Sequence, residues 1–171
     1  MSSITRRTIT GVAALAIAAG GAGFAGAQMD MPSTTTAPTT AKKTVVTKKN
    51  IVITNPWVRV VPPGSRNTAG YMSIRSVRKA DALVRASVPS SIAMKTELHL
   101  SRMDPDTGQM MMVQQKRIGI PRNRTRQLKM GSYHIMIMGL KKDITPGMRI
   151  PITLTFLRAG TVKVTAVAKD M

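Results

Sequence analysis

The chain has 171 residues, a formal net charge of +19 and 43% hydrophobic residues, enough for one domain with a buried core. The absence of cysteine excludes disulfides, thiolate metal sites and a cysteine-ligated blue-copper centre, whereas methionine occurs 14 times. Aromatic residues make up only 3% of the chain and the basic residues are scattered, so the charge predicts a well-solvated surface and no nucleic-acid partner.

Residues 1–27 have the pattern of an export signal. Arg6 and Arg7 precede an apolar run over 11–24, and the sequence Ala-Gly-Ala over 25–27 is a typical cleavage signal before Gln28. The paired arginines fit both the Sec and the twin-arginine route, which leaves the route open. Because no later apolar stretch has this length, we expect a periplasmic or otherwise exported mature chain without stable membrane insertion.

Residues 28–49 are predicted to be a disordered linker. The segment is polar, rich in threonine and proline, and carries several lysines that repel one another. Met29 and Met31 lie close to the new N-terminus, where they are candidate auxiliary metal ligands, although chance is the simpler account.

Residues 50–171 are predicted to form an all-β domain. Short β-type runs alternate with turn signals such as Pro-Pro-Gly over 62–64, and no segment keeps the apolar spacing of a helix. Many short strands with frequent turns favour an antiparallel sandwich or barrel. The expected strands cover 51–53, 57–61, 69–76, 82–88, 95–101, 110–115, 124–130, 133–138, 150–157 and 161–167.

The sequence from Tyr133 to Leu140 is the first candidate metal-binding segment. His134 and Met136 are two residues apart, so on a strand they project from the same face, with Met138 next along. A methionine stripe on a sheet face is often part of a core. A buried imidazole, however, needs a polar partner that methionine does not supply, and a soft metal ion would satisfy both groups.

The second candidate segment is a hairpin that begins near the other histidine, His99. Its tip is predicted at 104–108, and the returning strand carries Met110 and Met112 on one face. A hairpin brings a histidine on one strand close to methionines on the next. The spacing is therefore compatible with one His–Met pair meeting a second.

No catalytic arrangement competes with metal binding. The chain has no cysteine nucleophile, no Gly-x-Ser-x-Gly elbow and no phosphate-binding glycine loop, and its seven acidic residues are dispersed. The sequence therefore predicts a binding protein and not an enzyme.

Several blocks of the sequence resemble the PCu(A)C family of periplasmic copper chaperones. The family signature is a His, a Met about ten residues later, and His-x-Met after a further twenty-one. Here twenty-one residues separate Met112 from His134, whereas twelve separate His99 from Met112, and Met110 fits the first gap but misses the second. The other matching blocks are Trp57-Val58-Arg59, Pro62-Pro63-Gly64, Ala69-Gly70-Tyr71, Glu97-Leu98-His99, Tyr133–Leu140 and Ile152–Phe156.

The resemblance implies a cupredoxin-like antiparallel β-sandwich with Greek-key topology that binds one Cu(I) ion. Its ligands would be His99, Met112, His134 and Met136, with Met110 as the alternative to Met112. The ion would pass to a copper-accepting protein, such as a cytochrome c oxidase subunit during assembly of its copper centre or another copper-transfer protein. Thioether and imidazole donors suit soft Cu(I), and they need no thiol.

Two other functions remain open at this point. A copper-storing or tolerance protein would use the same site and differ only in its partner. A basic sandwich that binds acidic glycan or a membrane surface would instead keep the Met/His cluster in its core. Exposure distinguishes these cases, since a transfer site must present its sulfurs at the surface.

Overall fold

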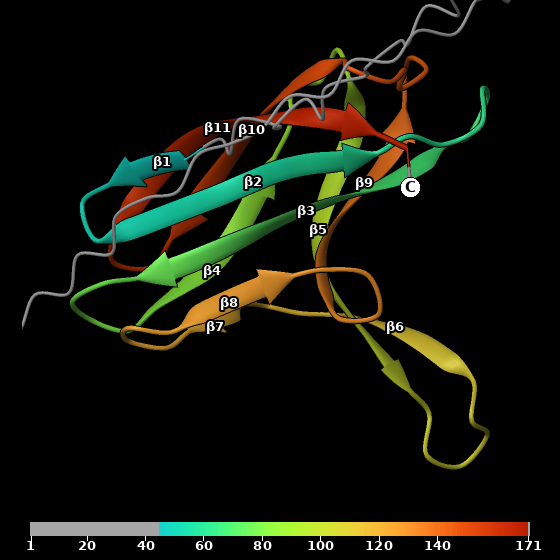
Figure 1. Ribbon diagram of the computed structural model, residues 1–171. Helices are drawn as coiled ribbons and strands as arrows, with labels where there is room; N and C mark the ends of the chain where they lie inside the picture. The colour runs from blue at the N-terminus through green and yellow to red at the C-terminus, as the bar shows by residue number, and fades with distance from the viewer. Residues whose placement is uncertain (1–44, 171) are drawn as a thin grey trace, which may run out of the picture. The chain divides into compact units, whose positions relative to one another are not determined.

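The computed structural model describes residues 45–170, which form strands and turns without a helix (Figure 1). The all-β prediction is therefore confirmed. The strands are β1 (Val45–Lys48), β2 (Ile51–Arg59), β3 (Asn67–Ser76), β4 (Asp81–Ser87), β5 (Ala93–Met103), β6 (Met110–Gln114), β7 (Ile118–Ile120), β8 (Thr125–Leu128), β9 (Tyr133–Leu140), β10 (Arg149–Phe156) and β11 (Gly160–Lys169).

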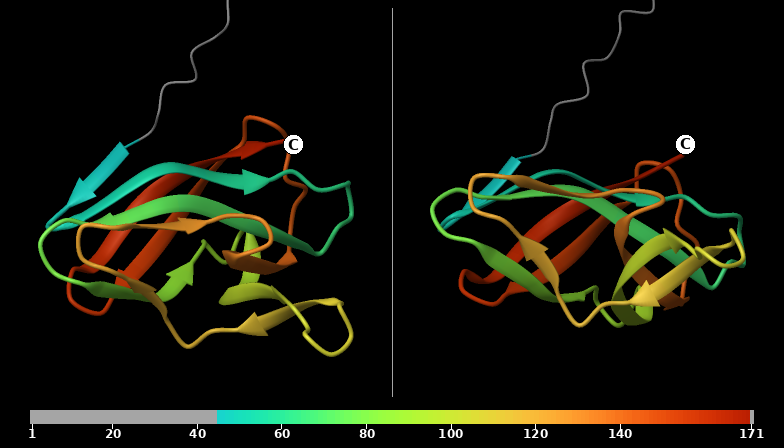
Figure 2. Two further views of the ribbon diagram at one scale, coloured as in Figure 1. Left: turned by 60° about the horizontal axis from the view of Figure 1, so that its bottom comes forward. Right: turned by 90° about the horizontal axis from the view of Figure 1, so that it is seen from below.

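The strands pair in the order β6-β5-β9-β3-β2-β11-β10-β4-β7, with β1 added to β2 and β8 added to β3. The pairing of β11 with β2 is parallel, and the other strand pairs are antiparallel. The first half of β3 pairs with β9 and its second half with β8, so the sheet branches there. Figure 2 shows the strands of this domain wrapping around a common interior.

The core is built from aliphatic side chains on alternating strand positions. In β10, Ile150, Ile152 and Leu154 are fully buried, whereas the residues between them point outward, as period-two alternation requires. Burial of each such side chain contributes about 1.5–3 kcal/mol. Among the buried hydrophobic residues of 45–170, Met72 is the single methionine.

Two sequence-based boundaries were wrong at the start of the domain. The end of the predicted linker forms β1, because Val45 and its β-branched neighbours complete a ladder with β2. The runs 51–53 and 57–61 belong to one strand, whose register shifts between Thr54 and Trp57 and thereby accommodates a proline that cannot donate to the ladder. The predicted export signal and the linker up to residue 44, with Met29 and Met31, lie outside the described residues.

The β5–β6 hairpin extends from the sandwich, as Figure 1 shows at the lower right. Its tip closes through backbone hydrogen bonds from Asp104 N–H to Gln109 O (2.7 Å) and from Gly108 N–H to Asp104 O (2.9 Å). Gly108 has φ +66°, a left-handed conformation that glycine adopts without strain. The predicted hairpin is thus confirmed, and it carries the methionines of β6 outward.

Candidate metal centre

Strands β5, β6 and β9 bring the candidate ligands to one face of the sheet. His99 lies directly opposite His134 in the β5–β9 ladder, and Met112 lies opposite Ser101 in the β5–β6 ladder. Because Ser101 follows His99 by two residues, both ladders present these side chains on the same side. Met136, two residues beyond His134, faces the same way.

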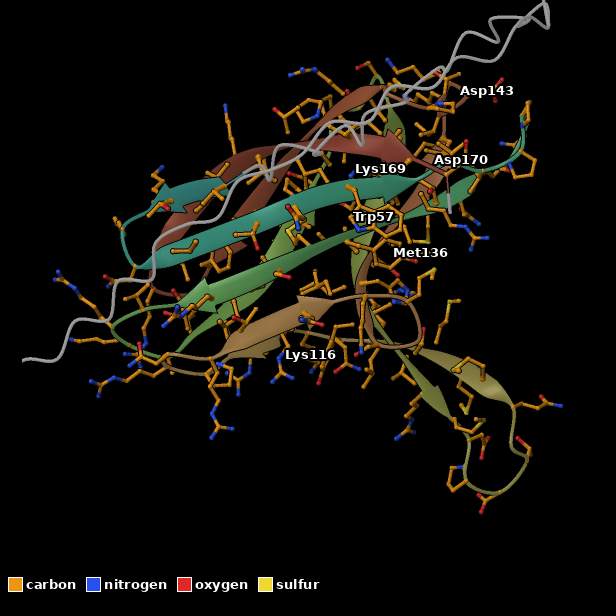
Figure 3. The ribbon with its side chains drawn as sticks, viewed as in Figure 1. Trp57, Lys116, Met136, Asp143, Lys169 and Asp170 are labelled. Atoms are coloured by element: carbon orange, nitrogen blue, oxygen red, sulfur yellow. The ribbon has the colours of Figure 1, made fainter. Side chains whose placement is uncertain are left out.

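An open pocket of about 320 Å³ lies on this face. His134, Met136, Met112 and Met110 line it, together with Met130 from the turn before β9. Figure 3 labels Met136 at the end of the sandwich from which the hairpin extends. His99 is not among the lining residues. Its ring meets the His134 ring edge-on, with the ring centroids 5.7 Å apart.

One ring nitrogen of His134 forms a hydrogen bond, and the other keeps a free lone pair. The Ser132 carbonyl accepts hydrogen bonds from Nδ1–H of His134 (3.0 Å) and from the Ser101 N–H (3.1 Å). Because a carbonyl can only accept, Nδ1 of the neutral ring carries the proton and Nε2 keeps its lone pair. The side chain is buried, and this burial, with the nearby His99, lowers the His134 pKa and favours the neutral form.

The ring of Tyr71 supports His134 from the neighbouring strand β3. The two ring centroids are 6.4 Å apart, and Tyr71 in turn packs against Trp57 with a centroid distance of 4.6 Å. Such aromatic contacts hold the rings in place and give the imidazole little freedom to rotate.

His99 is oriented by a carboxylate that the sequence analysis did not single out. Glu97 Oε2 lies 2.9 Å from Nε2 of His99, and Glu97 Oε1 lies 2.5 Å from Lys95 Nζ. These contacts, with Lys95 the larger, lower the Glu97 pKa and keep it ionised. Nε2–H therefore donates to the carboxylate, and Nδ1 is left as the bare nitrogen. The Glu-x-His spacing was the available signal, since it places both residues on one strand face.

The bare Nδ1 of His99 is the one buried side-chain nitrogen or oxygen of the described residues that has no hydrogen-bond partner. An unsatisfied buried polar atom costs about 1–3 kcal/mol, so this atom calls for an explanation. A carboxylate that fixes an imidazole while the other nitrogen stays bare is the usual support of a histidine metal ligand. The donor set therefore fits a soft metal ion.

The thioether side chains at the pocket are accessible. Met112 is 60% exposed and Met110 57% exposed, whereas His134 is 3% exposed. The cluster thus has a buried nitrogen side and an exposed sulfur side. This distribution differs from a Met/His cluster packed in the core.

The pocket depends on sulfur donors. No group of three or more His, Asp or Glu side chains is placed to hold a metal ion anywhere in 45–170. A metal ion held in this pocket would therefore need the methionines as well as the histidines.

Residues 45–170 contain no helix with the length and hydropathy needed to cross a bilayer.

Comparison with known proteins finds a family model and a curated relative that are both described as putative lipoproteins. The family described as "Putative lipoprotein LpqE-like" matches residues 51–168. The "Putative lipoprotein Lxx21020" of Leifsonia xyli subsp. xyli (strain CTCB07) is 29% identical over 120 residues, which cover 70% of this chain and 70% of that protein.

Solved structures show the same fold. The copper-bound PCuAC domain from PmoF2 superposes with a TM-score of 0.62 at 19% identity, covering 75% of this chain and 99% of that domain. The solution structure of CuI-DR1885 from Deinococcus radiodurans gives 0.52 at 28% identity, covering 73% and 80%. The predicted cupredoxin-like β-sandwich is confirmed, and the resemblance to PCu(A)C domains extends to the fold. Since the family match spans most of the described domain, the chain belongs to the LpqE-like lipoprotein family.

Proposed function

We propose that the protein is an exported copper chaperone that binds one Cu(I) ion in the pocket between β5, β6 and β9. The observation that carries this proposal is the pairing of two imidazoles, each with one bare nitrogen, with exposed thioether sulfurs on one sheet face. This donor set suits Cu(I), which prefers soft sulfur and imidazole ligands. The CuI form of DR1885, a protein of the same fold, supports the choice of ion.

The ligands proposed are His99 through Nδ1, His134 through Nε2, Met136, and Met112. Met110 is the alternative to Met112, because both line the pocket. Two neutral imidazoles and two thioethers leave the single positive charge of the ion in place. They also require no deprotonated thiol, so such a site works in an oxidising compartment.

Release of the ion follows from the uneven exposure of the ligands. The acceptor's donors can reach the ion from the side of Met112, whereas His134 lies buried behind it. Thioethers bind more weakly than thiolates, so the exposed sulfur is the ligand that an acceptor displaces first. The arrangement suits transfer of a metal ion, and we assign no catalytic step to it.

We propose export through residues 1–27 and delivery to a copper-accepting protein outside the cytoplasm. The LpqE-like family description, a lipoprotein, agrees with export. A cytochrome c oxidase subunit that receives its copper centre is the acceptor we favour. The basic surface, with a net charge of +19 for the whole chain, suits an acidic acceptor. A copper-storing protein would use the same ligands and lack the acceptor.

A competition titration of the purified chain with Cu(I) against a chromogenic chelator tests the site. We expect one tight equivalent in the wild-type protein and its loss in His134→Ala. Because His134 is buried, Met112→Leu serves as a second variant that leaves the sandwich intact, and Met111→Leu, on the opposite face of β6, is the matched control. Folded wild-type protein that fails to compete would overturn the proposal and favour a basic module that binds acidic glycan or membrane.

A further inference from the structure

Methionine dominates the exposed hydrophobic surface near the pocket. Six of the nine exposed large hydrophobic side chains in 45–170 are methionines, and four of these six lie in the part of the hairpin where β5 and β6 pair, 99–114. Aliphatic residues fill the core instead. Exposed apolar side chains that cluster in this way mark a binding surface more often than chance. The four-ligand site uses only one methionine of this hairpin, so the others lack an assigned role.

The register of the hairpin places Met112, Met110 and Met103 on one face, in order toward the hairpin tip. Met103 lies directly opposite Met110, one step beyond the pair formed by Ser101 and Met112 on the same face. Directly opposed residues have Cβ atoms about 5 Å apart, within the reach of two thioether side chains that meet on one ion. Met103 is 62% exposed and Met110 57% exposed, so neither residue is committed to the core.

Met130 contributes a further thioether to the pocket. It belongs to the turn between β8 and β9, lines the same pocket as Met110, and is 45% exposed. Met110 therefore has one thioether neighbour across the β5–β6 ladder, Met103, and shares its pocket with a second, Met130. Three neutral sulfurs are a donor set that favours Cu(I) over harder or divalent ions.

The hairpin tip adds a local negative charge to a strongly basic protein. Asp104, which follows Met103 directly, and Asp106 are two of only seven acidic residues in the chain. The N–H of Asp106 donates to the Asp104 carboxylate (2.9 Å), which lowers the Asp104 pKa and keeps the group ionised. Carboxylates beside the thioethers attract a cation that the rest of the surface would repel.

We propose that Met110, with Met103 and Met130, forms an outer Cu(I) site. The ion would pass through this outer site on its way between the solvent or a partner and the inner four-ligand site. The proposal rests on the chaperone function, because it adds a second position on the path of the same ion. The outer site lacks imidazole nitrogen, so it binds more weakly than the inner site and fills second. The proposal also decides which methionine of β6 is a ligand of the four-ligand site: Met112 belongs to the inner site and Met110 to the outer one.

An anaerobic Cu(I) titration of the whole chain, labelled with ¹³C at the methionine methyl groups, tests this arrangement. We expect the Met112 and Met136 signals to shift during the first equivalent. The signals of Met103, Met110 and Met130 should shift only during the second. Met110→Leu should abolish the second equivalent and leave the first intact, and Met103→Leu should weaken it.

Met111→Leu is the matched control, because Met111 lies on the same strand but pairs with Arg102 on the opposite face. It should leave both equivalents unchanged. A first equivalent without a second would overturn the outer site while the inner site stands. A Met110 signal that shifts with the first equivalent would also overturn it, because Met110 would then be an inner ligand. If no equivalent binds to folded protein, the chaperone function itself fails.

Discussion

The sandwich interior and the β5–β6 hairpin use apolar residues for different purposes. The interior is filled by isoleucine, leucine, valine and alanine, with Met72 as its one fully packed methionine among 45–170. The hairpin instead exposes Met103, Met110 and Met112 to solvent. Methionine packs well because it is flexible, but burial cannot be its purpose where it is exposed. The difference shows that the same side chain is packed inside the sandwich in one region and presented to solvent in the other.

The largest expected effect separates the two regions by stability. Leu154→Ala removes a fully buried side chain, and it should lower the free energy of unfolding by about 2–5 kcal/mol. Met112→Leu changes an exposed position, and it should shift the same quantity by less than about 0.5 kcal/mol. Urea unfolding of both variants checks this. Equal losses would show that the hairpin methionine is structural.

Copper affinity should respond in the opposite way. Met112→Leu keeps the approximate size of the side chain but removes its sulfur, so Cu(I) affinity should fall by about 100-fold or more, since loss of a residue that only orients a ligand already costs about 10–100-fold. Leu154→Ala should leave the affinity of the folded fraction unchanged. A chelator competition measures both. If Met110→Leu produces the loss and Met112→Leu does not, Met110 is the inner ligand.

A variant of Glu97 tests the orientation of His99. Glu97→Gln preserves the size of the side chain but removes the charged acceptor of Nε2–H, and Cu(I) affinity should fall by about 10–100-fold. The ¹⁵N signals of His99 should change from one dominant tautomer to a mixture, which a general loss of packing would not produce. Lys95→Ala is the control: Lys95 is exposed, so its removal should leave the tautomer in place.

Mild peroxide treatment should distinguish the buried methionine from the exposed ones. Met103, Met110 and Met112 should be converted to sulfoxides well before Met72, which is 2% exposed. Sulfoxide lacks the soft donor, so Cu(I) affinity should fall with oxidation of the hairpin. Mass spectrometry of peptides identifies the oxidised positions. Unchanged affinity after verified oxidation of Met112 and Met136 would contradict the proposed ligand set.

The smallest expected effect is a pH dependence of the metal-free protein. Burial lowers the His134 pKa in the folded state, so below pH ~6.5 the unfolded chain binds more protons than the native one. This contribution to stability is present above that pH and is lost as the pH falls toward the native pKa. Unfolding at pH 7.5 and pH 5.5 measures it, and His134→Gln should remove the difference.

The strand content and the shared sheet face of His134 and Met136 were predictable, because both depend on short-range periodicity. His134 and Met136 share a face by their spacing alone, and the tip at 104–108 places β6 beside β5. The register that sets His99 opposite His134 was not predictable, since it arises from the pairing of strands far apart in the chain. The tautomers depend on where Glu97 and Ser132 place their oxygens, which no sequence pattern specifies.

Sequence spacing alone fits neither Met110 nor Met112 fully as the metal ligand, and the fold explains why. The two residues lie two positions apart on one strand face, and both line the same pocket. The parallel pairing of β11 with β2 was likewise missed, because local alternation carries no information about strand direction.

Strand β6 has a single neighbour, β5, and therefore lies at the margin of the sheet. Marginal elements open first, through local fluctuations that leave the rest of a domain folded. An ion held by Met112 on one side and His134 on the other would fasten this strand to β9, to which it has no ladder hydrogen bonds. Metal release and fraying of β6 would then be one event, and amide hydrogen exchange in β6 would report the metal load of the protein.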